Sequence, residues 1–212
     1  GLLAMSGAPA TLNIQSRNGS ELDARTLAAT GVRLVVTGVR RDDLPDLAPQ
    51  SSIHLYTVAA PADRAAFFPD GAVQVLSREQ VHERLRDRTF DLASALLLRS
   101  DEVTPVRESA DPTAAPATAS YRRVSSDLIE VNVDAQTAGW IRVLESWDSG
   151  WSAEVDGHAA RVVAGDDMFL AVHVDRGTHQ VRLRFKTPGA VNGVAISLCS
   201  LLALVGLARH VR

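Results

Sequence analysis

The chain has little cysteine and little lysine, and each shortage excludes a class of protein. Its one cysteine, Cys199, lies within an apolar stretch, so the rest of the chain can form neither a disulfide framework nor a thiolate metal site. Lys186 is the only lysine, and the net charge of −3 carries no basic excess that would indicate nucleic acid as a partner. The sequence also lacks a nucleophile–base pair, a glycine-rich phosphate loop and metal-ligand spacing. We therefore expect no catalytic residue, no metal and no cofactor in this chain.

Charge is missing altogether from Thr187 to Ala208, and this absence predicts a membrane-spanning helix. About 18–20 apolar residues rising ~1.5 Å each reach ~30 Å, which is the thickness of a bilayer's hydrocarbon core. Arg209, His210 and Arg212 follow, and a charged cluster of this kind usually marks the cytoplasmic side. The sequence predicts a transmembrane helix at residues 188–208 and a cytoplasmic tail at 209–212. The alternative is a buried helix of a soluble core, which normally keeps one polar face.

Small side chains recur every fourth residue at the start of this segment. Gly189, Gly193 and Ser197 would lie along one side of the helix, where they would let another transmembrane helix approach closely. The pattern favours a polytopic parent protein. The alternative is that glycine is simply common in membrane helices.

The remainder divides at a proline-rich stretch. Residues 101–119 contain three prolines and almost no large apolar side chain, which predicts a linker. Residues 1–100 indicate a small α+β unit. Two helices are expected: one is capped by Ser20, runs to Ala29 and ends at Gly31, and the other runs from a capping box at Ser77–Gln80 to about Arg88. Strands are expected at 32–37, 52–58, 65–68 and 72–76, and residues 90–98 could form either a strand or a helix.

Residues 120–187 show the two-residue alternation of β-strands. Ile129, Val131 and Val133 alternate with polar neighbours, as do later segments up to residue 185. Asp156-Gly157 is a strong signal for a tight hairpin, because type I′ turns need positive φ at both central residues. Roughly seven short strands predict a β-sandwich, jelly-roll-like in its connections. The predicted fold class is thus an α+β N-terminal unit, an all-β sandwich and a C-terminal transmembrane helix.

Two tryptophans suggest a binding site within the sandwich. Trp147 and Trp151 flank a turn at Asp148, where an indole pair could stack on a sugar ring while Asp148 or Asp156 binds its hydroxyl groups. The alternative is that both indoles fill the core, as tryptophan commonly does. Trp151 alternates with polar residues on the same strand as apolar Ala153 and Val155, which favours a core position for Trp151. For Trp147 the sequence does not decide between the core and the surface.

Other polar residues favour structural roles. His179 shares a face with apolar residues, which favours a hydrogen-bonded core or edge histidine. Asp166-Asp167 precedes a strand and most simply forms a turn.

One ordered series of motifs resembles a known family. The stretch Glu145–Gly157, with its Gly-Trp and Val-Asp-Gly elements, resembles the C-terminal signature of YfhO-type bacterial membrane proteins. The series continues through Phe169–Val174, Gly177–Val181 and Gly193–Leu198. Looser similarity extends back to about residue 20. Asp148 and Ser149 stand where the family often has Tyr and Pro.

The resemblance implies a location and a parent protein. YfhO-like proteins are polytopic and resemble GT-C glycosyltransferases, which take sugars from polyprenyl-phosphate carriers and whose catalytic carboxylate belongs to an early loop that this chain does not contain. It implies that the chain is the C-terminal piece of a longer protein of the bacterial plasma membrane, mostly extracytoplasmic and with its C-terminus in the cytoplasm. The implied partners are the lipid bilayer, other transmembrane helices of the parent, and an envelope glycan or polyprenyl-linked sugar. The alternative function is a non-catalytic, membrane-tethered sandwich that binds glycan or protein.

Overall fold

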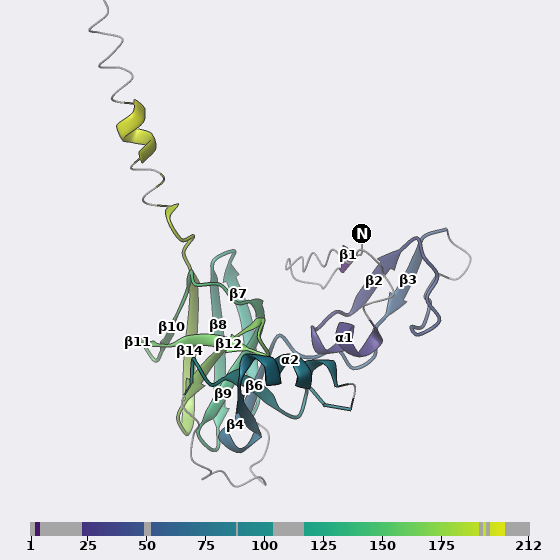
Figure 1. The fold of residues 1–212 in the computed structure, drawn as a ribbon, viewed down its shortest axis with the longest axis horizontal. Coiled ribbons are helices and arrows are strands. Elements are labelled where there is room, and N and C mark those ends of the chain that lie inside the picture. The colour runs from purple at the N-terminus through teal and green to yellow at the C-terminus, as the bar shows by residue number, and fades with distance from the viewer. Residues whose placement is uncertain are drawn as a thin grey trace, which may run out of the picture.

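The computed structural model describes residues 3–4, 23–48, 52–87, 89–103, 117–190, 193 and 196–201. Within these residues the protein is built mainly of β-strands and has few helices (Figure 1). The first part of the chain contains β1 (Leu3–Ala4), α1 (Ala24–Ala29), β2 (Leu34–Thr37), β3 (His54–Thr57), β4 (Ala65–Pro69), the 3₁₀ helix η1 (Asp70–Ala72), β5 (Val73–Leu76), α2 (Arg78–Arg86) and β6 (Leu96–Arg99). The second part contains β7 (Ala119–Ser125), β8 (Leu128–Ala135), β9 (Gly139–Ser146), β10 (Trp151–Val155), β11 (His158–Ala160), β12 (Val162–Gly165), β13 (Phe169–Val174) and β14 (Gly177–Phe185).

Two facing sheets form a sandwich, which confirms the β-sandwich expected from the alternation. One sheet has the order β11-β10-β14-β8-β7 and is called the open sheet below. The other has the order β4-β9-β13-β12-β6-β5 and is called the covered sheet. Apolar residues from both sheets pack in one cluster between them, including Ile129, Val131, Val181 and Leu183 from the open sheet and Ile141, Val143, Leu170 and Val172 from the covered sheet. The jelly-roll-like connectivity stays a prediction.

The two sheets differ in how their outer faces are treated. Residues of β14 alternate between buried and exposed, whereas β9 is buried along almost its whole length. The outer face of the covered sheet carries a second apolar cluster, which includes Leu96 and Leu98 of β6, Trp140 of β9 and Ala171 of β13. Continuous apolar runs therefore mark the sheet that is buried on both sides.

Strands from before residue 100 belong to the covered sheet. β4 pairs antiparallel with β9, and β6 pairs with β12 through Gly165 and Leu98. β5 pairs parallel with β6, with α2 as the crossover between them, and Val81 of α2 packs against Leu97. The division of the chain at residues 101–119 stays a prediction, but the sandwich in the structure uses strands from both sides of it.

The helix boundaries correct two expectations. Helix α1 begins after Asp23, whose carboxylate accepts a hydrogen bond from the Thr26 amide at 2.8 Å; the predicted cap, Ser20, lies outside the described residues. Gly31 ends the helix with φ of 73°, as expected, because that left-handed conformation suits glycine. The capping box of α2 is confirmed at Ser77 and Gln80, although the helix ends at Arg86 rather than Arg88.

A small sheet, β1-β2-β3, lies beside the sandwich with α1 on it (Figure 1). Its core joins Leu27 of α1 to Val35 and Tyr56 of the strands. The Tyr56 hydroxyl accepts a hydrogen bond from the Arg41 amide at 2.7 Å, which satisfies the polar end of a fully buried ring.

The chain leaves the open sheet at the end of β14, and helical residues 196–201 lie away from the sandwich (Figure 1). Ile196, Leu198 and Leu201 are 56–67% exposed there. Among the residues described by the structure, no helix has both the length and the apolar character needed to cross a bilayer. The predicted span at 188–208 extends beyond the described residues, as does the tail at 209–212, so both stay predictions.

Candidate functional site

The turn between β9 and β10 carries the predicted tryptophan site. The Trp147 side chain is 40% exposed, and its amide donates to the Met168 carbonyl at 2.8 Å. The Asp148 carboxylate accepts a hydrogen bond from the Gly150 amide at 2.7 Å, and the Trp151 amide donates to the Asp148 carbonyl at 3.1 Å. One oxygen of the Asp148 carboxylate is thus used to close its own turn, as aspartate commonly does.

Gly150 brings this turn against the end of β14. A Cβ atom at Gly150 would lie 2.4 Å from the Lys186 carbonyl oxygen, 2.7 Å from the Phe185 ring and 3.1 Å from the Pro188 ring. The Lys186 amide also donates to the Gly150 carbonyl at 2.9 Å. The backbone contact requires a residue without a side chain, and it places the turn where the chain leaves the sandwich.

Trp151 packs against the core rather than into solvent. It is partly buried against the central cluster, and its ring lies 5.3 Å from that of Phe185 at a tilt of 54°. This arrangement agrees with the core position that its alternation favours.

Asp156 lies at the opposite end of β10 from the two tryptophans. Trp151 is paired with Phe185 and Val155 with Val181, so the length of the strand, roughly 3.4 Å per residue, separates Asp156 from Trp151. Asp156 and Gly157 have φ of 52° and 82°, which confirms the tight hairpin. The structure therefore does not bring Asp156 together with the tryptophan turn.

The Asp156 carboxylate binds His179 and the neighbouring strand. Its oxygens lie 2.7 Å from His179 Nδ1 and 2.8 Å from the Gln180 amide that donates to it. The Gln180 amide and then His179 lower the pKa of Asp156, and the hydrogen bond to Asp156 raises the pKa of His179. His179 is thus hydrogen-bonded, as the sequence favours, and it lies on β14, the middle strand of the open sheet.

A buried ion pair, which the sequence analysis missed, lies in the covered sheet. Arg142 Nη1 donates to Asp166 Oδ2 at 2.8 Å and to the Leu92 carbonyl at 2.9 Å, and both charged side chains are no more than 3% exposed. Asp166 Oδ1 accepts from the Leu97 amide at 3.0 Å. Burial raises the pKa of Asp166, and Arg142 opposes this shift. The sequence did contain one indication of this pair: an arginine lies within the apolar run of β9, and a buried charge needs a partner.

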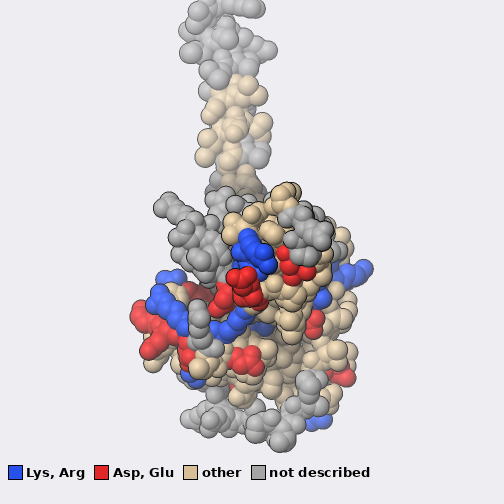
Figure 2. Space-filling model, turned by 90° about the vertical axis from the view of Figure 1, so that its right-hand side faces the viewer, with Lys and Arg blue, Asp and Glu red and all other residues tan. Residues whose placement is uncertain are grey.

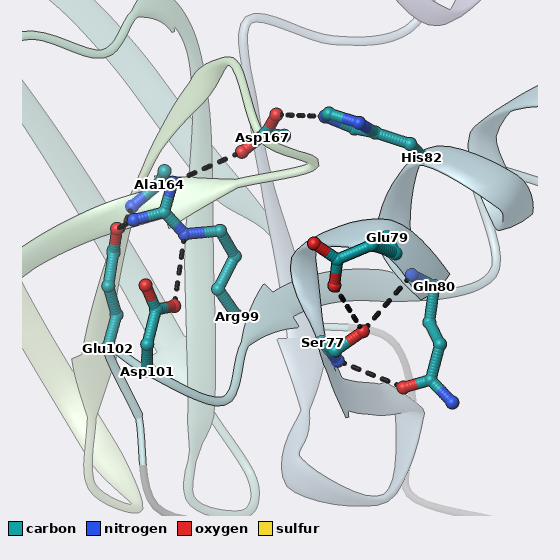
Figure 3. A network of polar contacts seen from close by, with 9 residues as sticks. All are labelled: Ser77, Glu79, Gln80, His82, Arg99, Asp101, Glu102, Ala164 and Asp167. Atoms are coloured by element: carbon teal, nitrogen blue, oxygen red, sulfur yellow. Dashed lines mark hydrogen bonds and ion pairs between the residues drawn. The ribbon is translucent and has the colours of Figure 1, made fainter.

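Asp167 joins a second set of polar contacts, shown in Figure 3. Its carboxylate lies 2.6 Å from His82 Nε2 of α2 and 3.4 Å from Arg99 Nη1 of β6. Arg99 also pairs with Glu102, which accepts from the Ala164 amide at 3.0 Å. Asp166 and Asp167 do form the expected turn, with φ of 51° and 58°, and they also fasten α2 and β6 to it.

Two adjoining cavities lie beside the Arg142–Asp166 pair. They measure about 110 and 260 Å³ and share Arg25, Ala29, Leu92 and Arg142 in their linings. The shared arginines donate to the Phe90 and Leu92 carbonyls and so hold the loop before β6 in place. Both volumes fall below the ~300 Å³ at which small-molecule sites usually begin.

The described part of the chain contains no group of three or more acidic, histidine or cysteine residues placed to hold a metal ion. Acidic and basic side chains are intermingled on the face shown in Figure 2 rather than gathered in a patch of one sign. The polar contacts of these residues hold strands, turns and helices together, and Trp147 is the exposed aromatic residue among the described ones near the turn.

The predicted helix-packing residues lie on the segment beyond β14. Gly189 has φ of 75° and forms a turn, and the Gly193 amide donates to its carbonyl at 2.8 Å. A Cβ atom at either glycine would meet no atom within 4 Å among the described residues. Ser197 is helical and exposed. Packing against another helix stays a prediction.

Part of the chain is similar to a known protein family. Residues 113–197, roughly two fifths of the chain, are similar to a class of bacterial membrane proteins. The matching family is that of the bacterial membrane protein YfhO, so the resemblance seen in the sequence is confirmed over these residues. No curated protein and no solved structure matches the chain significantly.

Proposed function

We propose that this chain is the membrane-tethered, extracytoplasmic C-terminal portion of a polytopic envelope protein that resembles lipid-linked-sugar glycosyltransferases. Its role is accessory: the sandwich covers a membrane active site that other parts of the parent protein supply, or it holds an acceptor glycan there. The proposal assigns no catalytic residue to this chain.

The extent of the family match is the observation that carries the proposal. The match begins before β7, runs through the open sheet and ends at residue 197, inside the apolar segment. Strands β7 to β14 and the start of the apolar segment thus fall within one family match, which supports a bilayer rather than a protein core as the environment of that segment.

The exposed residues beyond β14 agree with a lipid environment. Ile196, Leu198 and Leu201 are exposed, and the neighbouring Ser200 hydroxyl donates to the Ile196 carbonyl at 2.9 Å. A hydroxyl that is satisfied within its own helix is tolerated in hydrocarbon, whereas an unsatisfied one costs free energy.

Cysteine accessibility tests the topology. Cys199 is the only cysteine, so Cys199→Ser gives a background without thiols. Into this background, Ala159→Cys places a thiol on exposed β11, and His210→Cys places one beyond the apolar run. In a bacterial host, with the 212-residue chain behind a cleavable export signal, a membrane-impermeant maleimide should label the Ala159→Cys variant in intact spheroplasts. The His210→Cys variant should react only after permeabilisation.

Labelling of both variants in intact spheroplasts, or of His210→Cys alone, would overturn the proposed topology. The encoding gene gives an independent check, because the parent should contain several further membrane spans. Fewer than that would end the link to a polytopic parent.

A tethered glycan-binding sandwich without a catalytic parent is the second candidate, and the exposed indole of Trp147 favours it. It predicts that the chain binds envelope glycans and that Trp147→Ala abolishes the binding. Trp151→Phe, a change at the packed indole, should leave it intact.

A further inference from the structure

The exit of the chain from the sandwich is held by backbone contacts from two loops. The Phe185 amide donates to the Asp127 carbonyl at 2.8 Å, in the connection between β7 and β8, and the Lys186 amide donates to the Gly150 carbonyl at 2.9 Å. Figure 1 shows the segment leaving at this end of β14, where β10 begins. The turn after Trp147 is thus part of the base from which the apolar segment starts.

The distance from this base to the first helical residue is short. From Phe185 to Ala190 the chain could reach at most about 17 Å if it were fully extended, and a turn at Pro188–Gly189 shortens it. The headgroup layer on each side of a bilayer is roughly 5–8 Å thick. If the apolar helix enters hydrocarbon near Ala190, the tight contact of Gly150 with Lys186 and Pro188 places the turn at the depth of the lipid headgroups.

The side chains at this end suit that depth. Indole rings concentrate at membrane–water interfaces, where the ring contacts acyl chains and the N–H group reaches water or a carbonyl. Trp147 is 40% exposed and lies one residue before the turn. Lys186 is also exposed, and an ammonium group on a flexible stem can reach lipid phosphate.

The polar groups do not favour a sugar at the same place. One Asp148 oxygen is bound to the Gly150 amide, and Asp156 lies at the opposite end of β10, where it binds His179. Of the two carboxylates proposed to bind sugar hydroxyls, Asp148 is thus partly occupied by its own turn, and Asp156 lies far from Trp147.

We infer that the turn at residues 147–150, together with Lys186, docks in the lipid headgroup layer, with Trp147 as its interfacial anchor. This contact fixes the orientation of the sandwich relative to the bilayer, so that the sandwich does not rotate freely about residues 186–189. The inference rests on the proposed membrane tether and adds a second contact with the membrane.

Tryptophan fluorescence in vesicles tests the inference, because the chain has three tryptophans. Trp140→Phe with Trp151→Phe leaves Trp147 as the only indole, and Trp147→Phe with Trp151→Phe leaves the buried Trp140 as a matched control. The 212-residue chains are reconstituted in vesicles of phosphatidylcholine and phosphatidylglycerol, with and without bromine atoms near the top of the acyl chains. We expect brominated lipid to quench Trp147 several-fold more than Trp140.

A variant with one substitution guards against misfolding of the double variants. Trp147→Phe alone, with both other indoles kept, should remove the quenching component that the native chain shows. Vesicle flotation of the same samples reports the tether separately from the anchor.

Chains that float but show equal quenching of Trp147 and Trp140 would overturn the anchor while leaving the tether intact. Chains that do not float would overturn both. Protection of Trp147 by added glycan, without lipid quenching, would overturn the anchor in favour of the glycan-binding alternative.

Discussion

The open and covered sheets differ in where their charged side chains lie. On the open sheet a row of charged side chains crosses neighbouring strands in register, and Glu130 is paired with both Arg122 and Arg182. On the covered sheet a single pair, Arg142 and Asp166, is enclosed at 2–3% exposure. Arg122 and Arg182 are 69% and 50% exposed, and the buried Glu130 between them keeps one cation when the other is removed, whereas the enclosed pair depends on both members.

The largest expected effect is at the enclosed pair. Arg142→Met should lower the free energy of unfolding by about 3–5 kcal/mol, because it leaves Asp166 buried without its cation. Urea unfolding of the detergent-solubilised chain, followed by circular dichroism, measures it. Adding Asp166→Asn should recover part of the loss. A loss no greater than that of a surface arginine would mean that the two sheets do not differ in this way.

The next largest effect on stability is expected at Gly150, in the turn that connects β9 of the covered sheet with β10 of the open sheet. Gly150→Ala should cost about 1–3 kcal/mol, because the new methyl group overlaps the Lys186 carbonyl and the Phe185 ring. The same unfolding experiment applies. Gly38→Ala is the matched control, since a Cβ atom there meets nothing within 4 Å. Equal stability of the two variants would contradict the close contact at the base of β14.

A smaller effect is expected on the open sheet. Arg182→Ala should cost about 0.2–1 kcal/mol, because Arg182 is half exposed and Glu130 keeps Arg122 as a partner. Its dependence on salt concentration should also exceed that of Arg142→Met, since exposed charges are screened. A cost similar to that of Arg142→Met would remove the contrast between the sheets.

The smallest effect is the pH dependence of the hairpin at Asp156. The raised pKa of His179 stabilises the fold below about pH 6.5, its unfolded value, and this contribution is lost as pH rises through the folded pKa. The lowered pKa of Asp156 stabilises the fold above about pH 4 and is lost as pH falls further. In a plot of melting temperature against pH, the native chain should therefore lose stability as pH rises above about 6.5, and His179→Asn should reduce this loss. An unchanged loss in the variant would contradict the contact.

Sequence periodicity predicted the open sheet well. Its strands alternate because one face meets the core and the other meets water, and the Asp156-Gly157 turn has a specific backbone requirement. Capping of α2 at Ser77 was equally local and equally predictable. Each of these features is encoded within a few consecutive residues.

The covered sheet was less predictable because its pairings are not local. β4 and β6 join β9 and β12, which lie far along the chain, and short apolar runs do not show which strand they pair with. The partner of Arg142 was hidden for the same reason: Asp166 resembles an ordinary turn residue until the strands are assembled. Of the predicted glycan site, the turn at Trp147 keeps an exposed indole, while Asp156 is too far along β10 to join it.

The pairing of β4 and β6 with strands from beyond residue 117 has a consequence for a severed chain. Backbone ladders join the two parts, so a break between residues 103 and 117 would leave pieces that recognise each other as sheet edges. Within one chain the intervening peptide serves to keep their effective concentration high. Each fragment produced alone would present an unmatched strand edge, and mixing the two would restore the native assembly at a rate set by their concentrations.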